Sequence, residues 1–214
     1  AEAAAVRFVR AHTRIPVPRV WAVVPWFGDY YLLMRRVRGI ELTAVWPTLD
    51  STVRERITTQ VRGFIDQLRA LRSPFGERIC SATGGRVHDP RLPARHRGPF
   101  ANEEAFNYVL RYFEPLANLP ASVQEAHALV HAVVFTHGDV LPRNVMVDAA
   151  QPERVLALLD WDAAGWFPAH WEYRKARWTA ESGLENSWVS RIVQPYVFEA
   201  DADDYLARRF WAPG

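Results

Sequence analysis

The sequence predicts an α+β protein of two lobes, in which a small sheet comes first and a mainly helical body follows. Three observations predict this order. Two short runs of aromatic and β-branched residues flank Phe27-Gly28-Asp29, long stretches with helical periodicity follow, and two further strand-like runs lie between residues 144 and 159. With 214 residues and 49% hydrophobic composition, the chain can bury one core, as a single domain or as a domain of two lobes.

The first part of the chain predicts a helix and a β-hairpin. Residues 2–12 have helical spacing, with Val6 and Val9 on one face. The prolines in residues 15–18 end this helix, because each disfavours helical geometry at the residue before it. Residues 19–24 and 30–34 then read as the two strands of a hairpin.

The middle of the chain predicts three helices and a long loop. The first helix begins at Asp50 or Ser51, either of which is a good N-cap, and runs to about residue 71. Residues 73–101 contain prolines and glycines without periodicity, which is typical of a surface loop. Asn102 is expected to cap the second helix, and residues 122–132 form the third.

The last part of the chain predicts a second hairpin followed by helices. Residues 144–148 and 154–159 read as its two strands, joined by a short polar connection. From Trp171 onward the chain is rich in tryptophan and is expected to be helical. Trp161, Trp166, Trp171 and Trp178 could form an aromatic cage for a quaternary ammonium, but core packing is the stronger interpretation. The acidic run from Glu199 to Asp204 predicts a solvated helix face, or else a contribution to a substrate site.

Composition narrows the class of protein. The net charge is +2, which gives no reason to expect a nucleic acid or a membrane surface as partner. Cys80 is the single cysteine, so no intramolecular disulfide can form and a reducing compartment is favoured. No apolar run is long enough to span a bilayer, and the first residues lack a signal-peptide pattern. We therefore expect a soluble, cytoplasmic chain.

Two acids and an amide carry the chemistry that the sequence suggests. Asp139 follows a predicted strand within His137-Gly138-Asp139, Asn144 lies five residues later, and Asp160 ends the second strand of the later hairpin. Phosphoryl transfer needs a carboxylate beside the attacking hydroxyl and hard oxygen ligands for Mg²⁺. Asp139 can accept the hydroxyl proton, while Asn144 and Asp160 can hold the ion. Repulsion between the two acids should raise the pKa of at least one. The alternative is that all three residues only stabilise turns and a strand end.

This segment resembles the catalytic segment of the aminoglycoside phosphotransferase and choline kinase family, and of its fungal aminoglycoside phosphotransferase-like members in particular. His137-Gly138-Asp139 with Asn144 is followed by Leu158-Leu159-Asp160-Trp161-Asp162, as in that family. The resemblance continues upstream in residues 7–9, 13–18 and 31–39, so that it covers most of residues 2–175.

The resemblance implies a protein-kinase-like fold with ATP and Mg²⁺ bound between two lobes. Residues 1–38 would be the remnant of an N-terminal nucleotide-binding lobe with its hinge, and residues 39–214 the C-terminal catalytic and substrate lobe. The implied activity is an ATP-dependent O-phosphotransferase that acts on a hydroxyl of a small metabolite or of an aminoglycoside-like substrate.

The resemblance also assigns roles to individual residues. In the catalytic loop, Asp139 matches the catalytic base, His137 an orienting residue, and Asn144 and Asp160 the magnesium ligands. For the nucleotide, Met34 matches the residue behind the adenine, and the Arg35 carbonyl and the Val37 amide match the hinge groups that bind the base. Glu2 matches the glutamate that pairs with the phosphate-binding lysine. Met34 should point into a pocket, and the side chains of Arg35 and Arg36 should be exposed.

One departure from the family pattern limits the expected activity. Lys175 is the single lysine, and neither a lysine nor a glycine-rich strand pair precedes Glu2. We therefore expect either that further residues precede Ala1 in the natural protein, or that the chain is a catalytically inactive, kinase-like binding or interaction module. Residues 1–214 should have little activity alone, and the apolar face around Val6 and Val9 should be unusually exposed.

Histidines offer a weak indication of a metal site. His127 and His131 lie four residues apart in the third predicted helix, as helical metal ligands can. Two histidines do not supply the three or four ligands of a zinc site, so a structural role is the stronger interpretation.

Overall fold

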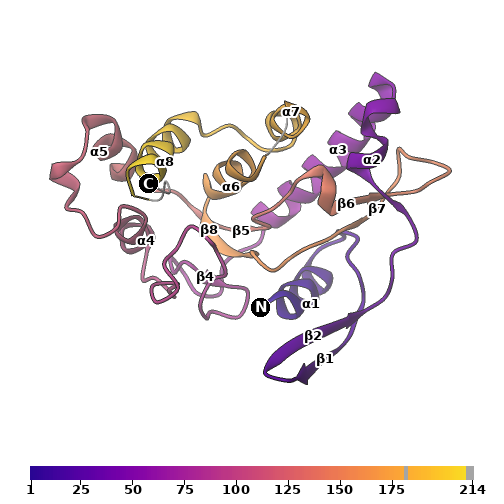
Figure 1. Ribbon diagram of the computed structural model, residues 1–214, viewed down its shortest axis with the longest axis horizontal. Helices are drawn as coiled ribbons and strands as arrows, with labels where there is room; N and C mark the ends of the chain where they lie inside the picture. Colours follow the sequence, from indigo (N-terminus) through magenta and orange to yellow (C-terminus); the bar gives the residue numbers. More distant parts are fainter. Residues whose placement is uncertain (181–182, 211–214) are drawn as a thin grey trace.

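The computed structural model describes residues 1–180 and 183–210, and it confirms the α+β class. Figure 1 shows a β-hairpin and the first helix at one end of the molecule, two small sheets at the centre, and most of the later helices at the other end. The N-terminus lies at the start of the first helix.

The first helix and hairpin form where the sequence predicts them. Helix α1 spans Glu2–His12, and strands β1 (Val20–Trp26) and β2 (Asp29–Met34) pair in antiparallel fashion. Phe27 and Gly28 connect the strands with φ angles of 47° and 90°. Positive φ at both central residues is the geometry that matches the twist of a two-residue hairpin.

The expected exposure of the first helix is wrong. Val6 and Val9 are 1% and 0% exposed, in one core with residues of both sheets and the long helix. The intervening Phe8 helps to seal this face, since its ring lies 5.0 Å from Phe135 and 5.7 Å from Trp166. Much of the exposed apolar surface is on the hairpin instead, where the large exposed side chains are Trp21, Val23, Val24, Trp26, Phe27, Tyr30, Tyr31 and Leu33.

The long helix α3 (Ser51–Arg69) contributes one buried face to the main core. Asp50 is its N-cap, and its carboxylate accepts the backbone N–H of Val53 at 2.9 Å. Two short elements precede it, α2 (Leu42–Val45) and the 3₁₀ turn η1 (Trp46–Thr48). The residues of α3 that are buried repeat with helical spacing: Ile57, Thr58, Val61, Ile65 and Leu68. The predicted periodicity is therefore confirmed.

Two three-stranded antiparallel sheets lie at the centre. In the first, β3 (Ile40–Glu41) pairs with β6 (Val145–Val147), which pairs with β7 (Val155–Leu158). In the second, β8 (Gly165–Pro168) lies between β4 (Cys80–Ser81) and β5 (Val133–Thr136). The hairpin of β6 and β7 is confirmed, with slightly shorter strands than predicted. Strands β3, β4 and β8 are not predicted; β4 lies inside the stretch assigned to a loop.

The remaining helices and two 3₁₀ turns follow β4 in the chain. Asn102 caps α4 (Glu103–Leu110) by accepting the N–H of Ala105 at 3.0 Å, as predicted. Helix α5 spans Ala121–Ala128 and ends four residues earlier than predicted, because the chain becomes extended at Leu129 on its way into β5. The other elements are η2 (Leu116–Asn118), η3 (Pro142–Asn144), α6 (Trp171–Thr179), α7 (Gly183–Ile192) and α8 (Val197–Phe210). Within the described residues, none of the helices combines the length and apolarity needed to cross a membrane.

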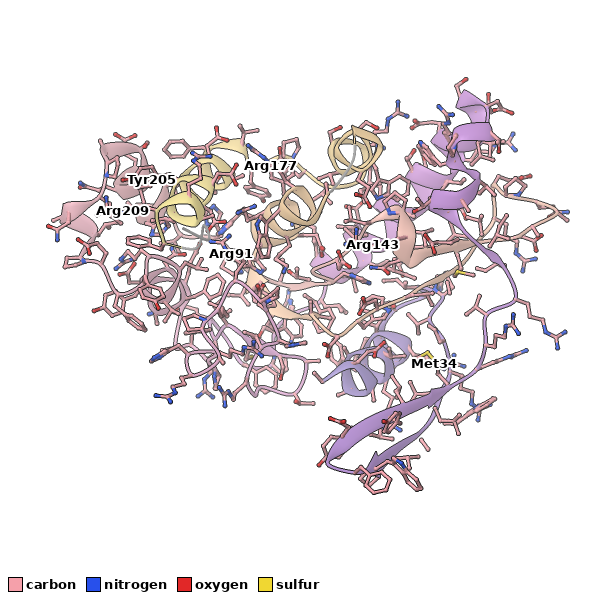
Figure 2. All side chains as sticks on the ribbon, viewed as in Figure 1. Met34, Arg91, Arg143, Arg177, Tyr205 and Arg209 are labelled. Carbon is pink, nitrogen blue, oxygen red and sulfur yellow. The ribbon has the colours of Figure 1, made fainter. Side chains whose placement is uncertain are left out.

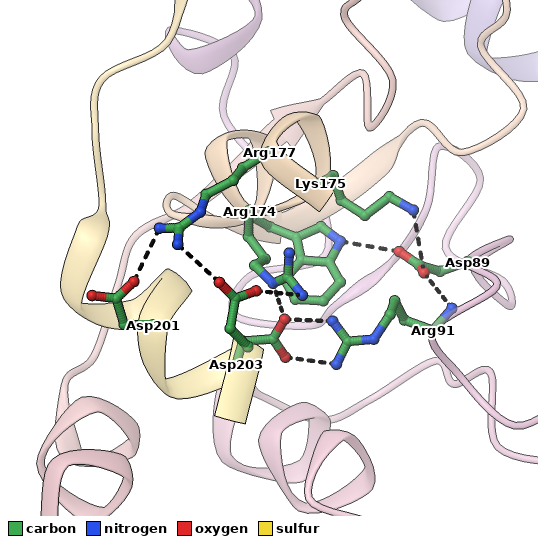
Figure 3. Close-up of polar contacts among 9 residues, drawn as sticks. Asp89, Arg91, Arg174, Lys175, Arg177, Asp201 and Asp203 are labelled. Carbon is green, nitrogen blue, oxygen red and sulfur yellow. Dashed lines mark hydrogen bonds and ion pairs between the residues drawn. The ribbon is translucent and has the colours of Figure 1, made fainter. Parts of the chain in front are cut away.

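The acidic run in α8 is an ion-pair network and not simply a solvated face. Asp203 is 5% exposed and accepts hydrogen bonds from the guanidinium groups of Arg91 and Arg174. Figure 3 shows how this carboxylate lies between the two arginines. At the rim, Arg177 bonds Asp201 at 3.1 Å and Asp204 at 2.9 Å. The network ties α8 to α6 and to the loop before α4.

Candidate active site

A loop runs from the end of β5 to the start of β6, and the expected catalytic residues of the sequence fix its backbone. The side-chain amide of Asn144 donates to the Asp139 carboxylate at 2.7 Å and to the Asp139 carbonyl at 2.9 Å. The turn η3 brings Asn144 back toward Asp139. The two side chains are therefore neighbours, as the spacing predicts.

Asp160 reaches the same place from β7. Val145 pairs with Leu158, and the backbone N–H of Leu159 donates to the Asn144 carbonyl at 2.8 Å. Asp160 follows directly, with a φ of 59° that non-glycine residues adopt rarely and that is common at functional sites. The β6–β7 hairpin thus brings the second acid next to Asn144.

The charges at this place repel one another. Partial burial raises the pKa of Asp160 first, and the neighbouring carboxylates of Asp139 and Asp162 raise it further; an N–H from Asp162 and the charge of Arg143 lower it in part. The predicted rise of one carboxyl pKa is therefore confirmed. A cation held by these oxygens would relieve the repulsion, and carboxylate and amide oxygens are the ligands that Mg²⁺ prefers.

His137 lies beneath the loop and is fully buried. Its Nδ1 accepts the backbone N–H of Asp139 at 3.1 Å, so its Nε2–H donates to the Leu159 carbonyl at 2.9 Å. Burial lowers the pKa of His137 to about 4, which keeps the ring neutral. A neutral ring with one donor and one acceptor links the two strands that carry Asp139 and Asp160.

Glu172, in the first turn of α6, anchors the loop from the other side. Its two carboxylate oxygens accept the backbone N–H groups of His137 at 2.6 Å and Gly138 at 2.9 Å. Burial raises the pKa of Glu172 to about 7, although both hydrogen bonds oppose the rise. The sequence shows a glutamate beside the tryptophan-rich helix but gives no sign of these partners, because they lie 34 and 35 residues away.

Arg143 and Glu185 also lie at this place, and no local pattern in the sequence identifies them. Arg143 donates to Asp139 at 2.8 Å and to Glu185 at 3.0 Å. Its side chain is 34% exposed and that of Asp139 is 18% exposed. Arg143 therefore orients the Asp139 carboxylate, and both side chains remain partly exposed to solvent.

Glu2 reaches the site from the start of α1. Its carboxylate accepts a hydrogen bond from the backbone of Trp161, and burial followed by the charges of Asp160 and Asp162 raises its pKa. Lys175 is not a partner for Glu2, because it is buried and pairs with Asp89 at 3.4 Å (Figure 3). Glu2 therefore lies near Asp160, and the single lysine lies elsewhere, beside Asp89.

The three predicted hinge residues lie at the end of β2, apart from the acids. Met34 is half-buried, on the side of β2 that faces α1 in Figure 2. Val37 is half-buried, and the N–H of Arg35 is bound to the Arg19 carbonyl at 2.8 Å. The predicted exposure of Arg35 and Arg36 is confirmed.

Comparison with known proteins shows the family and the fold. The model of the phosphotransferase enzyme family matches residues 1–211. No curated protein sequence is significantly similar to this chain. The fold is similar to solved structures of aminoglycoside phosphotransferases, three of which illustrate the range.

A thermostable mutant of aminoglycoside phosphotransferase APH(4)-Ia, in a ternary complex with ADP and hygromycin B, aligns with a TM-score of 0.54 and 16% identity over 99% of this chain and 84% of that one. Aminoglycoside-3'-phosphotransferase of type VIII aligns with a TM-score of 0.53 and 19% identity, over 100% of this chain and 73% of that one. The GDP complex of aminoglycoside 2'-phosphotransferase-IIIa aligns with a TM-score of 0.54 and 13% identity, over 97% of this chain and 79% of that one. The chain belongs to the phosphotransferase enzyme family, and its fold is that of the kinase-like aminoglycoside phosphotransferases.

Proposed function

We propose that the chain is an ATP-dependent O-phosphotransferase that acts on a hydroxyl group of a small molecule. The observation that carries this proposal is the convergence of Asp139, Asn144 and Asp160, with the pKa of Asp160 raised mainly by burial and by its neighbouring acids. Asp139 accepts the proton of the attacking hydroxyl, and Arg143 keeps its carboxylate oriented. Asn144 and Asp160 hold Mg²⁺, which, when bound, neutralises charge on the phosphoryl oxygens.

The nucleotide is proposed to bind between residues 1–38 and 39–214. Met34 closes the adenine side, the Arg35 carbonyl and the Val37 amide bind the base, and Glu2 faces the phosphates. Similar proteins solved with ADP, AMP-PNP or GDP support a nucleotide as co-substrate. Hygromycin B, gentamicin and streptomycin appear in structures of similar proteins, which supports an aminoglycoside-like compound or another small polyol as the acceptor. The single cysteine suits a reducing compartment such as the cytoplasm.

A second candidate is a catalytically inactive kinase-like module, and one observation favours it. The single lysine is bound to Asp89 and not to Glu2, so residues 1–214 offer no lysine to position ATP phosphates. Positioning supplies much of the rate of phosphoryl transfer. We therefore expect residues 1–214 alone to turn over ATP slowly even if they bind it.

The test is Mg²⁺-dependent transfer of labelled γ-phosphate from ATP to a panel of aminoglycosides, choline and homoserine. Asp139→Asn should abolish transfer with any substrate that reacts. Asp66→Asn is the matched control, because Asp66 is exposed on α3 away from the site. Nucleotide binding without transfer, in this chain and in a version extended upstream by a lysine-bearing segment, would favour the inactive module.

A further inference from the structure

A second cluster of ionisable side chains lies at the opposite end of β5 from the catalytic loop. Glu103 begins α4, His131 precedes β5, and His170 is the N-cap of α6. The hydrogen bond from the Ala169 N–H to the Ala132 carbonyl, at 3.0 Å, holds the two histidines side by side at the end of the β5–β8 ladder. The proposed phosphotransferase chemistry uses none of these three residues.

The three side chains are close enough together to share one metal ion. One ligand atom from each of the three residues lies within 4.8 Å of the others. The Glu103 Oε1 atom is 2.8 Å from Nδ1 of His131 and 3.5 Å from Nδ1 of His170. Ligand atoms about 2.1 Å from a tetrahedral ion are roughly 3.4 Å apart, so small side-chain rotations suffice to place an ion among the three.

His170 supplies an independent observation that points to a ligand. Its side chain is 9% exposed, and its Nδ1 has no hydrogen-bond partner among the described residues. Buried polar atoms in folded proteins are nearly always satisfied. This nitrogen lies beside the Glu103 carboxylate, and the two imidazole rings are 4.6 Å apart. An ion among the three residues would satisfy it.

The surroundings of the cluster fit a metal as well. The other ring nitrogen of His131 is 3.0 Å from Glu199 Oε1 in α8, and an outer carboxylate of this kind commonly orients a histidine that binds a metal. An open cavity of about 570 Å³, lined in part by Glu103 and His131, gives access from solvent. Two histidine nitrogens and a carboxylate suit Zn²⁺ better than Mg²⁺, because Mg²⁺ prefers oxygen ligands alone.

We propose that Glu103, His131 and His170 bind a zinc-type divalent transition metal through Glu103 Oε1 and the two Nδ1 atoms. Water completes the coordination, and Glu199 orients His131. The ion connects the start of α4, the entry to β5 and the start of α6, with α8 joined through Glu199. It is a structural clasp, remote from the Mg²⁺ ligands proposed for catalysis.

Binding of Zn²⁺ and Co²⁺ to the unmodified chain tests the proposal. Calorimetry should show one zinc equivalent, and Co²⁺ should give the intense visible bands of tetrahedral coordination. His170→Asn should remove this site, whereas Asp160→Asn, which alters the proposed Mg²⁺ site, should leave it. His127→Gln is the matched histidine control: His127 is a half-buried neighbour in α5 that contributes no ligand atom to the cluster.

A second variant keeps the test decisive if His170→Asn does not fold. Glu199→Gln retains all three ligands and should weaken zinc binding by about 10-fold to 100-fold, with the cobalt spectrum preserved. The proposal is overturned if the unmodified chain binds no stoichiometric zinc, or if its cobalt complex has only weak octahedral bands. It is equally overturned if Asp160→Asn or His127→Gln removes binding while His170→Asn does not.

Discussion

Replacing Asp203 by asparagine should be among the most destabilising single changes of charge in this protein. The carboxylate lies between two guanidinium groups whose side chains are each 1% exposed, those of Arg91 and Arg174. Burial alone would raise the pKa of Asp203, but these two arginines lower it to about 2. The folded-state pKa is thus below the ordinary value of 3.8. Asp203 therefore stabilises the fold fully above pH 4, and the contribution is lost only as pH falls toward 2.

The size of the effect follows from what asparagine leaves behind. Removing one partner of a buried ion pair typically costs about 3–5 kcal/mol, because the other charge stays buried without compensation. The upper part of this range is expected, since two guanidinium groups lose their shared partner. Arg91 Nε and Arg174 Nη1 already have no hydrogen-bond partner among the described residues. Arg174 keeps an ion pair with Asp204 at 3.2 Å, so Arg91 is the arginine left with fewer charged contacts.

Urea unfolding at pH 7 measures the effect, and Asp201→Asn is the matched control. Asp201 lies on the same helix and pairs with Arg177, but its side chain is 60% exposed, so its loss should cost less than about 1 kcal/mol. Adding Arg174→Met to Asp203→Asn should recover part of the lost stability, because it removes one of the uncompensated charges. Equal losses from Asp203→Asn and Asp201→Asn would refute the reasoning.

Three further changes test other parts of the structure. Gly138→Ala should lower both stability and phosphate transfer, because Gly138 has a φ of 85° and an added Cβ would lie 3.0 Å from Ala163; unfolding and transfer assays on one sample check this. Burial and, second, the charge of Arg111 lower the pKa of His127 from 6.5 to about 4. The neutral ring of His127 therefore stabilises the fold above pH 6.5, and this stabilisation is lost as pH falls toward 4, because only the unfolded chain binds the proton in that range. Relative to His127→Gln, the chain should lose about 3 kcal/mol of unfolding free energy between pH 7.5 and pH 4. Phe27→Asn should raise the unfolding free energy by roughly 1 kcal/mol, because asparagine tolerates the positive φ of Phe27 in a two-residue hairpin; unchanged or lower stability would contradict this.

Local signals predicted the part of the site that lies close together in the chain. Asp139 and Asn144 share one loop, and the hairpin that brings in Asp160 has strands of ordinary β-branched composition. Their proximity needs only the pairing of neighbouring strands, which short-range patterns predict well. The N-caps Asp50 and Asn102 were predictable for the same reason, since capping depends on a few consecutive residues.

Contacts between distant segments were not predictable from the same patterns. Strand β8 has only four residues, with glycine and proline at its ends, and Gly165 is needed because a Cβ would lie 2.6 Å from the Cys80 carbonyl. Val6 and Val9 are buried in a core shared with residues of β5 and β8, more than a hundred residues later in the chain. Glu172, Glu185 and His170 likewise gain their partners only through the tertiary fold.

The first turn of α6 joins the two sites of this molecule. His170 caps the helix at the Glu103–His131 cluster, and two residues later Glu172 holds the backbone amides of His137 and Gly138. Strand β5 makes the same connection from the other side, since it begins two residues after His131 and ends directly before His137. A movement of α6 relative to β5 would therefore disturb both sites together. A metal ion bound by Glu103, His131 and His170 would fix α6 to β5. It would thereby hold the backbone amides of His137 and Gly138, and the adjacent Asp139, in position.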